Sequence, residues 1–87
     1  MAFVYVLLSL KDGRQYIGSS NDVKKRLDKQ NKGYVASTKL RRPFILKGYQ
    51  VFETIREAVY FEKKYKRSHD SLRRAMEKGK FILVNGV

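Results

Sequence analysis

The stretch QYIGSSNDVKKRL, residues 15–27, passes within a few residues from a strand pattern to the start of a basic helix. An aromatic residue followed by a β-branched one is typical of a strand. Asn21 or Ser20 could cap the helix, and Asp22 would then lie in its first turn, where a negative charge is favourable. The stretch therefore predicts a strand that leads directly into a helix.

Upstream of this stretch, residues 3–10 are rich in Val, Leu and aromatic side chains and predict a partner strand. Asp12-Gly13 lies between the two strands and favours a two-residue hairpin turn, because both central residues of a type I′ turn need positive φ. This register pairs Ser9 with Tyr16 and places Tyr5 roughly 13 Å along the strand from that partner. A longer loop or a bulge would bring the two tyrosines closer.

Side-chain alternation along the hairpin separates two faces. Tyr5, Leu7 and Ser9 share one face with Tyr16. The other face is uniformly aliphatic, and we expect it to be core: Val4, Val6, Leu8 and Ile17.

The first helix has Val23 and Leu27 on an inward stripe, and Gly33 is expected to end it. Residues 34–43 predict an exposed basic loop, in which Pro43 disfavours helix for the residue before it. Residues 44–52 predict a third strand.

The second half of the chain predicts two helices. Thr54 and Glu57 match a capping box, so a helix is expected over residues 55–67, with an inward face formed by Ile55, Ala58, Val59 and Phe61. Asp70 is expected to cap a last helix that runs through Met76 and ends at Gly79.

The predicted order is β-β-α-β-α-α, followed by a short strand or apolar tail. This order indicates an α+β domain with a small antiparallel sheet, an N-terminal β-hairpin and helices packed on the sheet. We assign residues 1–80 to this domain and residues 81–87 to the C-terminal strand or tail.

The charge of the chain is strongly unbalanced. Twenty Lys and Arg residues against eight Asp and Glu give a net charge of +12. This favours a polyanionic partner, and nucleic acid before anionic lipid, because the cations are spread along the chain and no polybasic tail is present. A basic surface that serves only solubility is the alternative.

Two further features concern the compartment. The chain has no cysteine, which fits a reducing cytoplasm. No apolar run approaches the roughly 18–20 residues that span a bilayer, and the apolar N-terminus lacks the basic leader of a signal peptide. We therefore expect a cytoplasmic protein without a membrane segment.

Several motifs together resemble the GIY-YIG endonuclease domain, in its small stand-alone form. The second half of the family name is intact as Tyr16-Ile17-Gly18, and the tyrosine of the first half is Tyr5. Arg26 follows Tyr16 by ten residues. The segment TIREAVYFEKKYKR, residues 54–67, resembles the family's helix with a metal-binding glutamate, which falls on Glu62.

The resemblance implies metal-dependent hydrolysis of a DNA phosphodiester, with DNA favoured over RNA. Tyr5 would be the base and Tyr16 its hydrogen-bonding partner, or the reverse, and nearby positive charge would lower the pKa of the base. Arg26 would stabilise the charge on the phosphoryl oxygens. Glu62 would bind one Mg²⁺ or Mn²⁺.

Each of these residues also has a structural interpretation. The two tyrosines are common residues on half-buried strands. Arg26 could be one more solvated cation, and Glu62 could pair with Lys66 four residues later. His69 could be an exposed neighbour of a helix cap or a metal ligand, and Asn85 could approach the site.

Two positions depart from the family pattern. Ser19 stands where many relatives have a lysine, and Gln30 where many have a histidine or tyrosine. Gln30 can form a hydrogen bond but cannot take a proton. These departures leave open a second function, that of a catalytically weak or inactive module that binds nucleic acid.

Binding outside the site is expected to be electrostatic and directed by the structure of the nucleic acid, since no base-reading motif is present. The cations expected to contact the nucleic acid lie on the first helix, in the basic loop and on the second helix: Lys24, Lys25, Lys29, Lys39, Arg41, Arg42, Lys63 and Lys66.

Overall fold

The computed structural model describes residues 1–36 and 38–84 of the chain. The elements follow in the order β1 (Ala2–Ser9), β2 (Gln15–Ser20), α1 (Val23–Asn31), a 3₁₀ helix η1 (Lys39–Arg41), β3 (Phe44–Phe52), α2 (Ile55–Arg67), α3 (His69–Glu77) and β4 (Ile82–Leu83). The strands form one antiparallel sheet in the order β2-β1-β3-β4. This confirms the predicted α+β fold and the short final strand. Asn85 lies outside the described residues.

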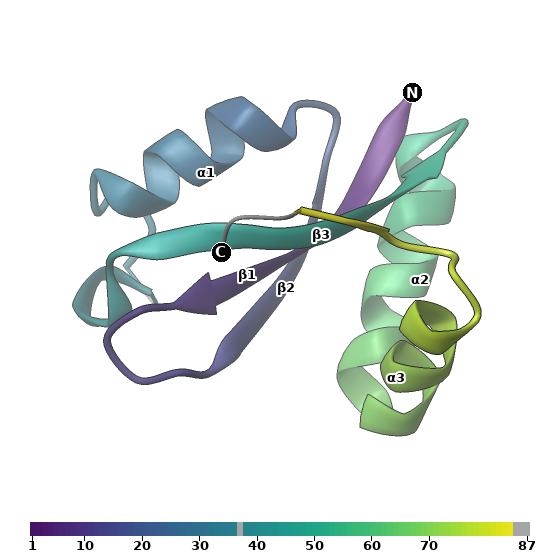
Figure 1. Ribbon diagram of the computed structural model, residues 1–87. Helices are drawn as coiled ribbons and strands as arrows, with labels where there is room; N and C mark the ends of the chain where they lie inside the picture. The colour runs from purple at the N-terminus through teal and green to yellow at the C-terminus, as the bar shows by residue number, and fades with distance from the viewer. Residues whose placement is uncertain (37, 85–87) are drawn as a thin grey trace.

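The sheet is covered on both faces (Figure 1). Helices α2 and α3 pack on one face, where they bury aliphatic side chains of β1 and β2 against Ala58, Tyr65, Leu72, Ala75 and Phe81. Helix α1 packs on the other face over a second cluster, formed by Tyr5, Leu7 and Phe44 with Tyr16, Val23, Leu27, Leu46 and Tyr49. The sequence predicted only the aliphatic face as core. Both faces are core, because each is covered by a helix.

The two predicted faces of the hairpin are otherwise correct. Val4, Val6 and Ile17 are buried under α2 and α3, whereas Leu8 is only partly buried. Tyr5 is 1% exposed, so its ring is fully enclosed on the α1 side. The face that carries the tyrosines is therefore not a free surface.

The predicted register of the hairpin is wrong by two residues. Tyr16 pairs with Leu7, not Ser9, and Tyr5 pairs with Gly18. The loop is longer than Asp12-Gly13, because the Ser9 hydroxyl accepts hydrogen bonds from the backbone N–H groups of residues 11 and 12. The longer loop brings Tyr16 closer to Tyr5 along the strands.

Two of the three predicted helix caps are wrong. The Asp22 side chain caps α1 by accepting from the N–H of Lys25, and Ser68 rather than Asp70 caps α3. In each case a side-chain oxygen accepts from the backbone N–H three residues later and so satisfies a free donor of the first turn. The predicted capping box of α2 is confirmed, since Thr54 accepts from the N–H of Glu57.

The inward face of α2 and the basic loop also differ from expectation. Ile55 is 41% exposed because it lies in the first turn, beyond the sheet-facing stripe that contains Ala58 and Tyr65. The segment 34–43 contains η1 and is not wholly exposed: Thr38 is buried and Arg41 is half-buried. No helix within the described residues is long and apolar enough to cross a membrane.

Candidate active site

Tyr5 reaches the edge of the sheet because its neighbour on β2 has no side chain. Gly18 pairs with Tyr5, and a Cβ on this glycine would lie 2.3 Å from Tyr5 Oη and 2.5 Å from Cζ. The phenol therefore passes over the Gly18 backbone. Since β2 is the outer strand of the sheet, this places the hydroxyl of a buried residue at the β2 edge.

Arg26 contacts this hydroxyl from helix α1. Its Nε donates a long hydrogen bond of 3.3 Å to Tyr5 Oη. Burial raises the pKa of Tyr5, although the hydrogen bond and the charge of Arg26 act in the opposite direction. The net direction is the reverse of the one expected for a tyrosine base, so the Tyr5 phenol is neutral near pH 7. The same contact with Tyr5 raises the pKa of Arg26.

Glu62 approaches the β2 edge from the opposite face. The Ser19 hydroxyl of β2 donates to Glu62 Oε1, and Lys66 Nζ lies 2.7 Å from Oε2. Lys66 Nζ is also 5.7 Å from the centre of the Tyr16 ring. The negative charge of Glu62 also raises the pKa of the Tyr5 phenol, as a smaller effect than burial.

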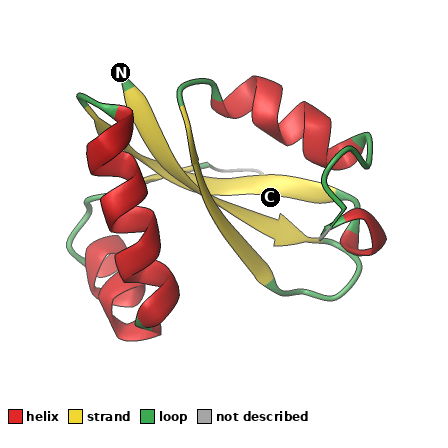
Figure 2. Ribbon diagram, turned by 180° about the vertical axis from the view of Figure 1, so that it is seen from behind, coloured by secondary structure: helices red, strands yellow, loops and turns green. Residues whose placement is uncertain are grey.

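The β2 edge therefore gathers the four candidate catalytic side chains, Tyr5, Tyr16, Arg26 and Glu62, together with Lys66. Figure 2 shows β2 running between α1, which contains Arg26, and α2, which contains Glu62. Arg26 is bonded to Tyr5, and Lys66 lies between Glu62 and Tyr16. Local folding explains the placement, because β2 supplies Tyr16 and leads straight into the helix of Arg26.

A model of the GIY-YIG catalytic domain matches residues 1–77. The chain belongs to the GIY-YIG family. The match includes β1, β2, α1 and α2, which together contribute all the side chains at the β2 edge.

Relatives of similar length include UPF0213 proteins of three bacteria. The one from Bacillus velezensis is 44% identical over 66 residues, which are 75% of this chain and 66% of the relative. Those from Staphylococcus saprophyticus and Bacillus pumilus are 40% identical over 58 and 63 residues, which are 66% and 71% of this chain and 70% and 64% of the relatives. The match spans slightly less than two thirds of both Bacillus proteins. No solved structure is a significant match.

The two positions that depart from the GIY-YIG pattern have different surroundings. Ser19 lies in the candidate site, bonded to Glu62. Gln30 is completely buried and accepts a hydrogen bond from the Thr38 hydroxyl, while its Nε2 has no partner among the described residues. Gln30 is therefore part of the packing under α1 and is not exposed at the β2 edge.

The donor set for a metal consists of one carboxylate. Within residues 1–36 and 38–84, no three His, Cys, Asp or Glu side chains cluster as metal ligands, and His69 is exposed at the start of α3. A single carboxylate with water and substrate oxygens suits Mg²⁺ or Mn²⁺, which keep several water ligands. Glu62 fits this role if one of its present contacts is released.

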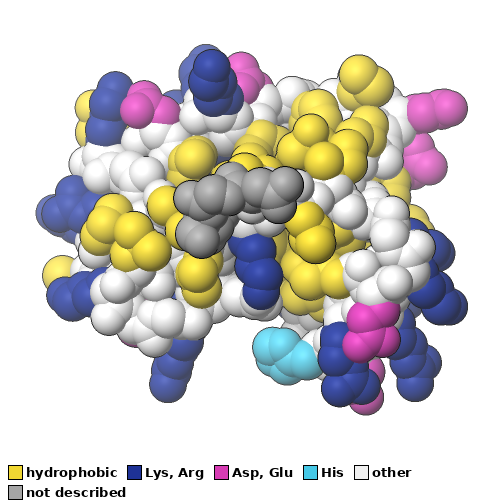
Figure 3. Space-filling view, in the orientation of Figure 1, with side chains coloured by type: hydrophobic (Ala, Val, Ile, Leu, Met, Phe, Trp, Pro, Cys, Tyr) yellow, Lys and Arg dark blue, Asp and Glu magenta, His cyan; other side chains and the backbone are white. Residues whose placement is uncertain are grey.

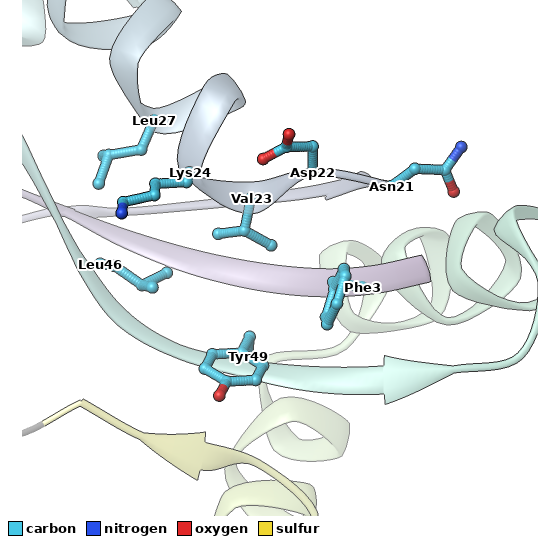
Figure 4. Close-up of a pocket in the computed structure, with 8 residues that line it drawn as sticks. All are labelled: Phe3, Asn21, Asp22, Val23, Lys24, Leu27, Leu46 and Tyr49. Carbon is cyan, nitrogen blue, oxygen red and sulfur yellow. The ribbon is translucent and has the colours of Figure 1, made fainter. Parts of the chain in front are cut away.

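Two hollows lie near α1, one lined mainly by charged side chains and the other mainly by apolar ones. A hollow of about 160 Å³ beside the candidate site is lined by Ser20, Asp22, Lys25, Arg26 and Lys29. An apolar cavity of about 370 Å³ between α1 and the sheet contains none of the candidate catalytic residues (Figure 4). It is lined by Phe3, Asn21, Asp22, Val23, Lys24, Leu27, Leu46 and Tyr49.

The predicted nucleic-acid contacts are not all equivalent. Lys25 and Lys29 lie beside Arg26, whereas Lys24 lines the apolar cavity. Arg41 already has a partner, because its Nε is 2.8 Å from Asp12 Oδ2. The backbone N–H of Arg14 and, after it, the Arg41 side chain lower the pKa of Asp12 to about 2. Lys66 is paired with Glu62. The remaining three, Lys39, Arg42 and Lys63, are exposed.

A second basic hollow, which sequence analysis missed, lies between α2 and α3. Its volume is about 200 Å³, and its charged lining is entirely cationic: Lys64, Arg74, Lys78 and Lys80. None of the four forms an ion pair with a carboxylate of the described residues. Arg74 lies on α3 and Lys78 directly follows it, four residues later. This helical spacing is the feature of the sequence that could have predicted a basic face here. On the face in Figure 3, Lys and Arg side chains lie around much of the perimeter.

Proposed function

We propose that the protein is a metal-dependent endonuclease that hydrolyses phosphodiester bonds of DNA and is directed by the structure of the DNA rather than its sequence. The observation that supports this most is the Arg26–Tyr5 hydrogen bond at the β2 edge, with the Glu62 carboxylate acting on the same phenol from the other face. Membership of a nuclease-type family supports the same reaction class.

Arg26 is the group proposed to bind the reacting phosphate. Its guanidinium borders the hollow that also contains Lys25 and Lys29, and such a cationic hollow suits a phosphate. The bond from Nε to Tyr5 fixes one edge of the guanidinium and leaves its other N–H groups for phosphoryl oxygens. A donor fixed in this way stabilises the charge that develops in the transition state.

The two tyrosines receive different roles. The Tyr5 phenol is buried and neutral near pH 7, so its role is to position Arg26. Tyr16 is half-buried and is the tyrosine that remains open to water. We therefore propose that Tyr16 is the base that accepts the proton of the attacking water. This is the reverse of the first arrangement given under Sequence analysis, in which Tyr5 is the base.

Glu62 is the residue that would hold the metal. A bound Mg²⁺ or Mn²⁺ would polarise a phosphoryl oxygen and stabilise the leaving oxygen. The Ser19 hydroxyl orients the carboxylate through Oε1.

The test is cleavage of plasmid and branched DNA in Mg²⁺ or Mn²⁺. Wild-type protein is expected to cut, and Arg26→Ala and Glu62→Gln are each expected to lower the cleavage rate by about 10² or more without unfolding the domain. Cutting that survives both substitutions would place the activity in another site or in a contaminant.

A second candidate function is a nucleic-acid-binding module with weak or no catalysis. The observation that favours it is that both oxygens of Glu62 already contact protein groups. Binding measured at several salt concentrations, with and without EDTA, separates the two. If about six cations neutralise phosphates, the log–log salt slope is near −5. Tight, salt-sensitive binding without metal-dependent cutting would favour the module.

A further inference from the structure

The Glu62–Lys66 ion pair differs from the other helical ion pairs in its burial. The Glu62 side chain is 18% exposed, against 61–68% for the carboxylates of the pairs made by Asp28, Asp70 and Glu77. Exposed pairs of this type contribute little because water and salt screen them. The pair at the β2 edge is shielded, so its ammonium is held more firmly.

Lys66 is placed among candidate site residues. Its Nζ is 2.7 Å from Glu62 Oε2 and 5.7 Å from the centre of the Tyr16 ring. The side chain is 48% exposed, and its flexible stem can swing without disturbing the core. The ammonium is therefore paired with Glu62, but its half-exposed stem allows it to leave when another anion is near.

The remaining Glu62 oxygen is also in use, since the Ser19 hydroxyl donates to Oε1. Ser19 is neutral and can share a carboxylate with a metal, whereas the Lys66 ammonium and a divalent ion repel each other at the same oxygen. A metal at Glu62 therefore requires Lys66 to leave. A DNA phosphate bound at the β2 edge by Arg26 is the anion that could receive it.

We propose that Lys66 is the resident cation of Glu62, that it competes with the divalent ion, and that its displaced ammonium contacts the scissile phosphate. This inference rests on the proposed nuclease function. Because the phosphate draws Lys66 away from Glu62, DNA and metal each strengthen the binding of the other, as linkage requires.

The first test uses the free full-length protein and Mn²⁺. Binding is followed by paramagnetic broadening of the amide signals of Ser19 and Glu62. Lys66→Gln is expected to bind Mn²⁺ about five- to tenfold more tightly, because one positive charge is lost beside the carboxylate. Lys32→Gln is the matched control, since it breaks the exposed pair with Asp28 four residues earlier, and it is expected to stay within about twofold of wild type.

The second test measures single-turnover cleavage at saturating Mn²⁺. Lys66→Gln is expected to cleave about tenfold or more slowly despite its tighter metal binding, because the phosphate loses an ammonium contact. Lys66→Arg keeps the charge, so it should recover part of the rate while binding Mn²⁺ no more tightly than wild type.

The outcomes separate the inference from the function. Equal Mn²⁺ affinity in wild type and Lys66→Gln, with normal metal-dependent cleavage by both, would overturn the inference and leave the nuclease standing. Tighter Mn²⁺ binding with an unchanged cleavage rate would overturn the contact with the phosphate. If no variant bound Mn²⁺ at Glu62 and none cut DNA, the proposed function would fail and the inference with it.

Discussion

The two basic regions of the molecule hold their cations in different ways. At the β2 edge, Arg26 is bonded to Tyr5 and Lys66 to Glu62. In the hollow between α2 and α3, the four cations have no ion pair with a described carboxylate. A cation that is held in place by a partner can stabilise charge on one particular atom of a substrate. An unpaired cation attracts the phosphates of a nucleic acid without selecting one of them. The comparison assigns chemistry to the first region and general affinity to the second.

The largest expected effect comes from removing one arginine in each region. Arg26→Ala should lower cleavage at saturating DNA by about 10²–10³, the usual cost of losing one fixed donor to a transition state. Arg74→Ala should weaken binding but leave cleavage at saturating DNA within about twofold, because its loss removes only a phosphate contact. Single-turnover cleavage rates at saturating DNA measure both effects. If the two variants lost the same amount of cleavage rate, the two regions would not differ in function.

A smaller effect, on stability, is expected from replacing one glycine beside each region with alanine. Gly18→Ala puts a Cβ 2.3 Å from Tyr5 Oη, so the ring must shift, at a cost of about 1–3 kcal/mol in the free energy of unfolding. Gly79→Ala meets no atom within 4 Å and should cost about 1 kcal/mol, from its φ of +74° alone. Urea unfolding gives both values.

The Gly18 prediction can be sharpened with a double-mutant cycle. Tyr5→Phe removes the oxygen that the new Cβ approaches most closely, so it should recover part of the stability lost in Gly18→Ala. Additive losses would show that Tyr5 does not pass over Gly18 as the geometry indicates.

Sequence reasoning predicted the elements well because their signals are local. The Thr54–Glu57 capping box and the strand at 44–52 are confirmed at their bounds. The error in hairpin register was even, and shifting an antiparallel pair by two residues keeps every side chain on its face. For this reason Tyr5 and Tyr16 were assigned correctly to one face despite the wrong turn.

The parts that failed depend on contacts distant in sequence. The burial that raises the pKa of Tyr5 comes from α1 packing over the sheet, which strand alternation does not show. The bond from Ser19 to Glu62 joins residues 43 positions apart, and Ser19 was seen only as a departure from a pattern. The basic hollow needs α3 to lie beside α2.

The third prediction measures how much affinity the α2–α3 hollow provides. The double variant Arg74→Gln/Lys78→Gln should weaken DNA binding roughly three- to tenfold at moderate salt and make the log–log salt slope shallower by about 2. Lys11→Gln/Lys32→Gln removes the same charge from the hairpin loop and the end of α1, and should change the slope less. Fluorescence anisotropy at several salt concentrations measures both variants. If the two double variants changed the salt slope by the same amount, the hollow would not be part of the DNA-binding surface.

The smallest expected effect compares the buried phenols of the two regions. Burial raises the pKa of Tyr5 at the β2 edge and of Tyr65 in the hollow. A raised folded-state pKa means that the folded protein keeps these protons where the unfolded chain has begun to lose them. The resulting stability is complete below about pH 10 and is lost as the pH rises through the folded-state values. Tyr5→Phe and Tyr65→Phe should each flatten this loss in urea unfolding above pH 10.

Arg26 distinguishes the two phenols. Its hydrogen bond and charge both oppose the effect of burial at Tyr5 and do not act on Tyr65. In Arg26→Ala the late part of the phenolate absorbance titration that belongs to Tyr5 should therefore move to still higher pH, while the part that belongs to Tyr65 stays in place. The Tyr5→Phe and Tyr65→Phe spectra make the assignment. A Tyr5 titration that Arg26→Ala leaves unmoved would mean that the guanidinium is not held against the phenol, and the β2 edge would then be no better organised than the hollow.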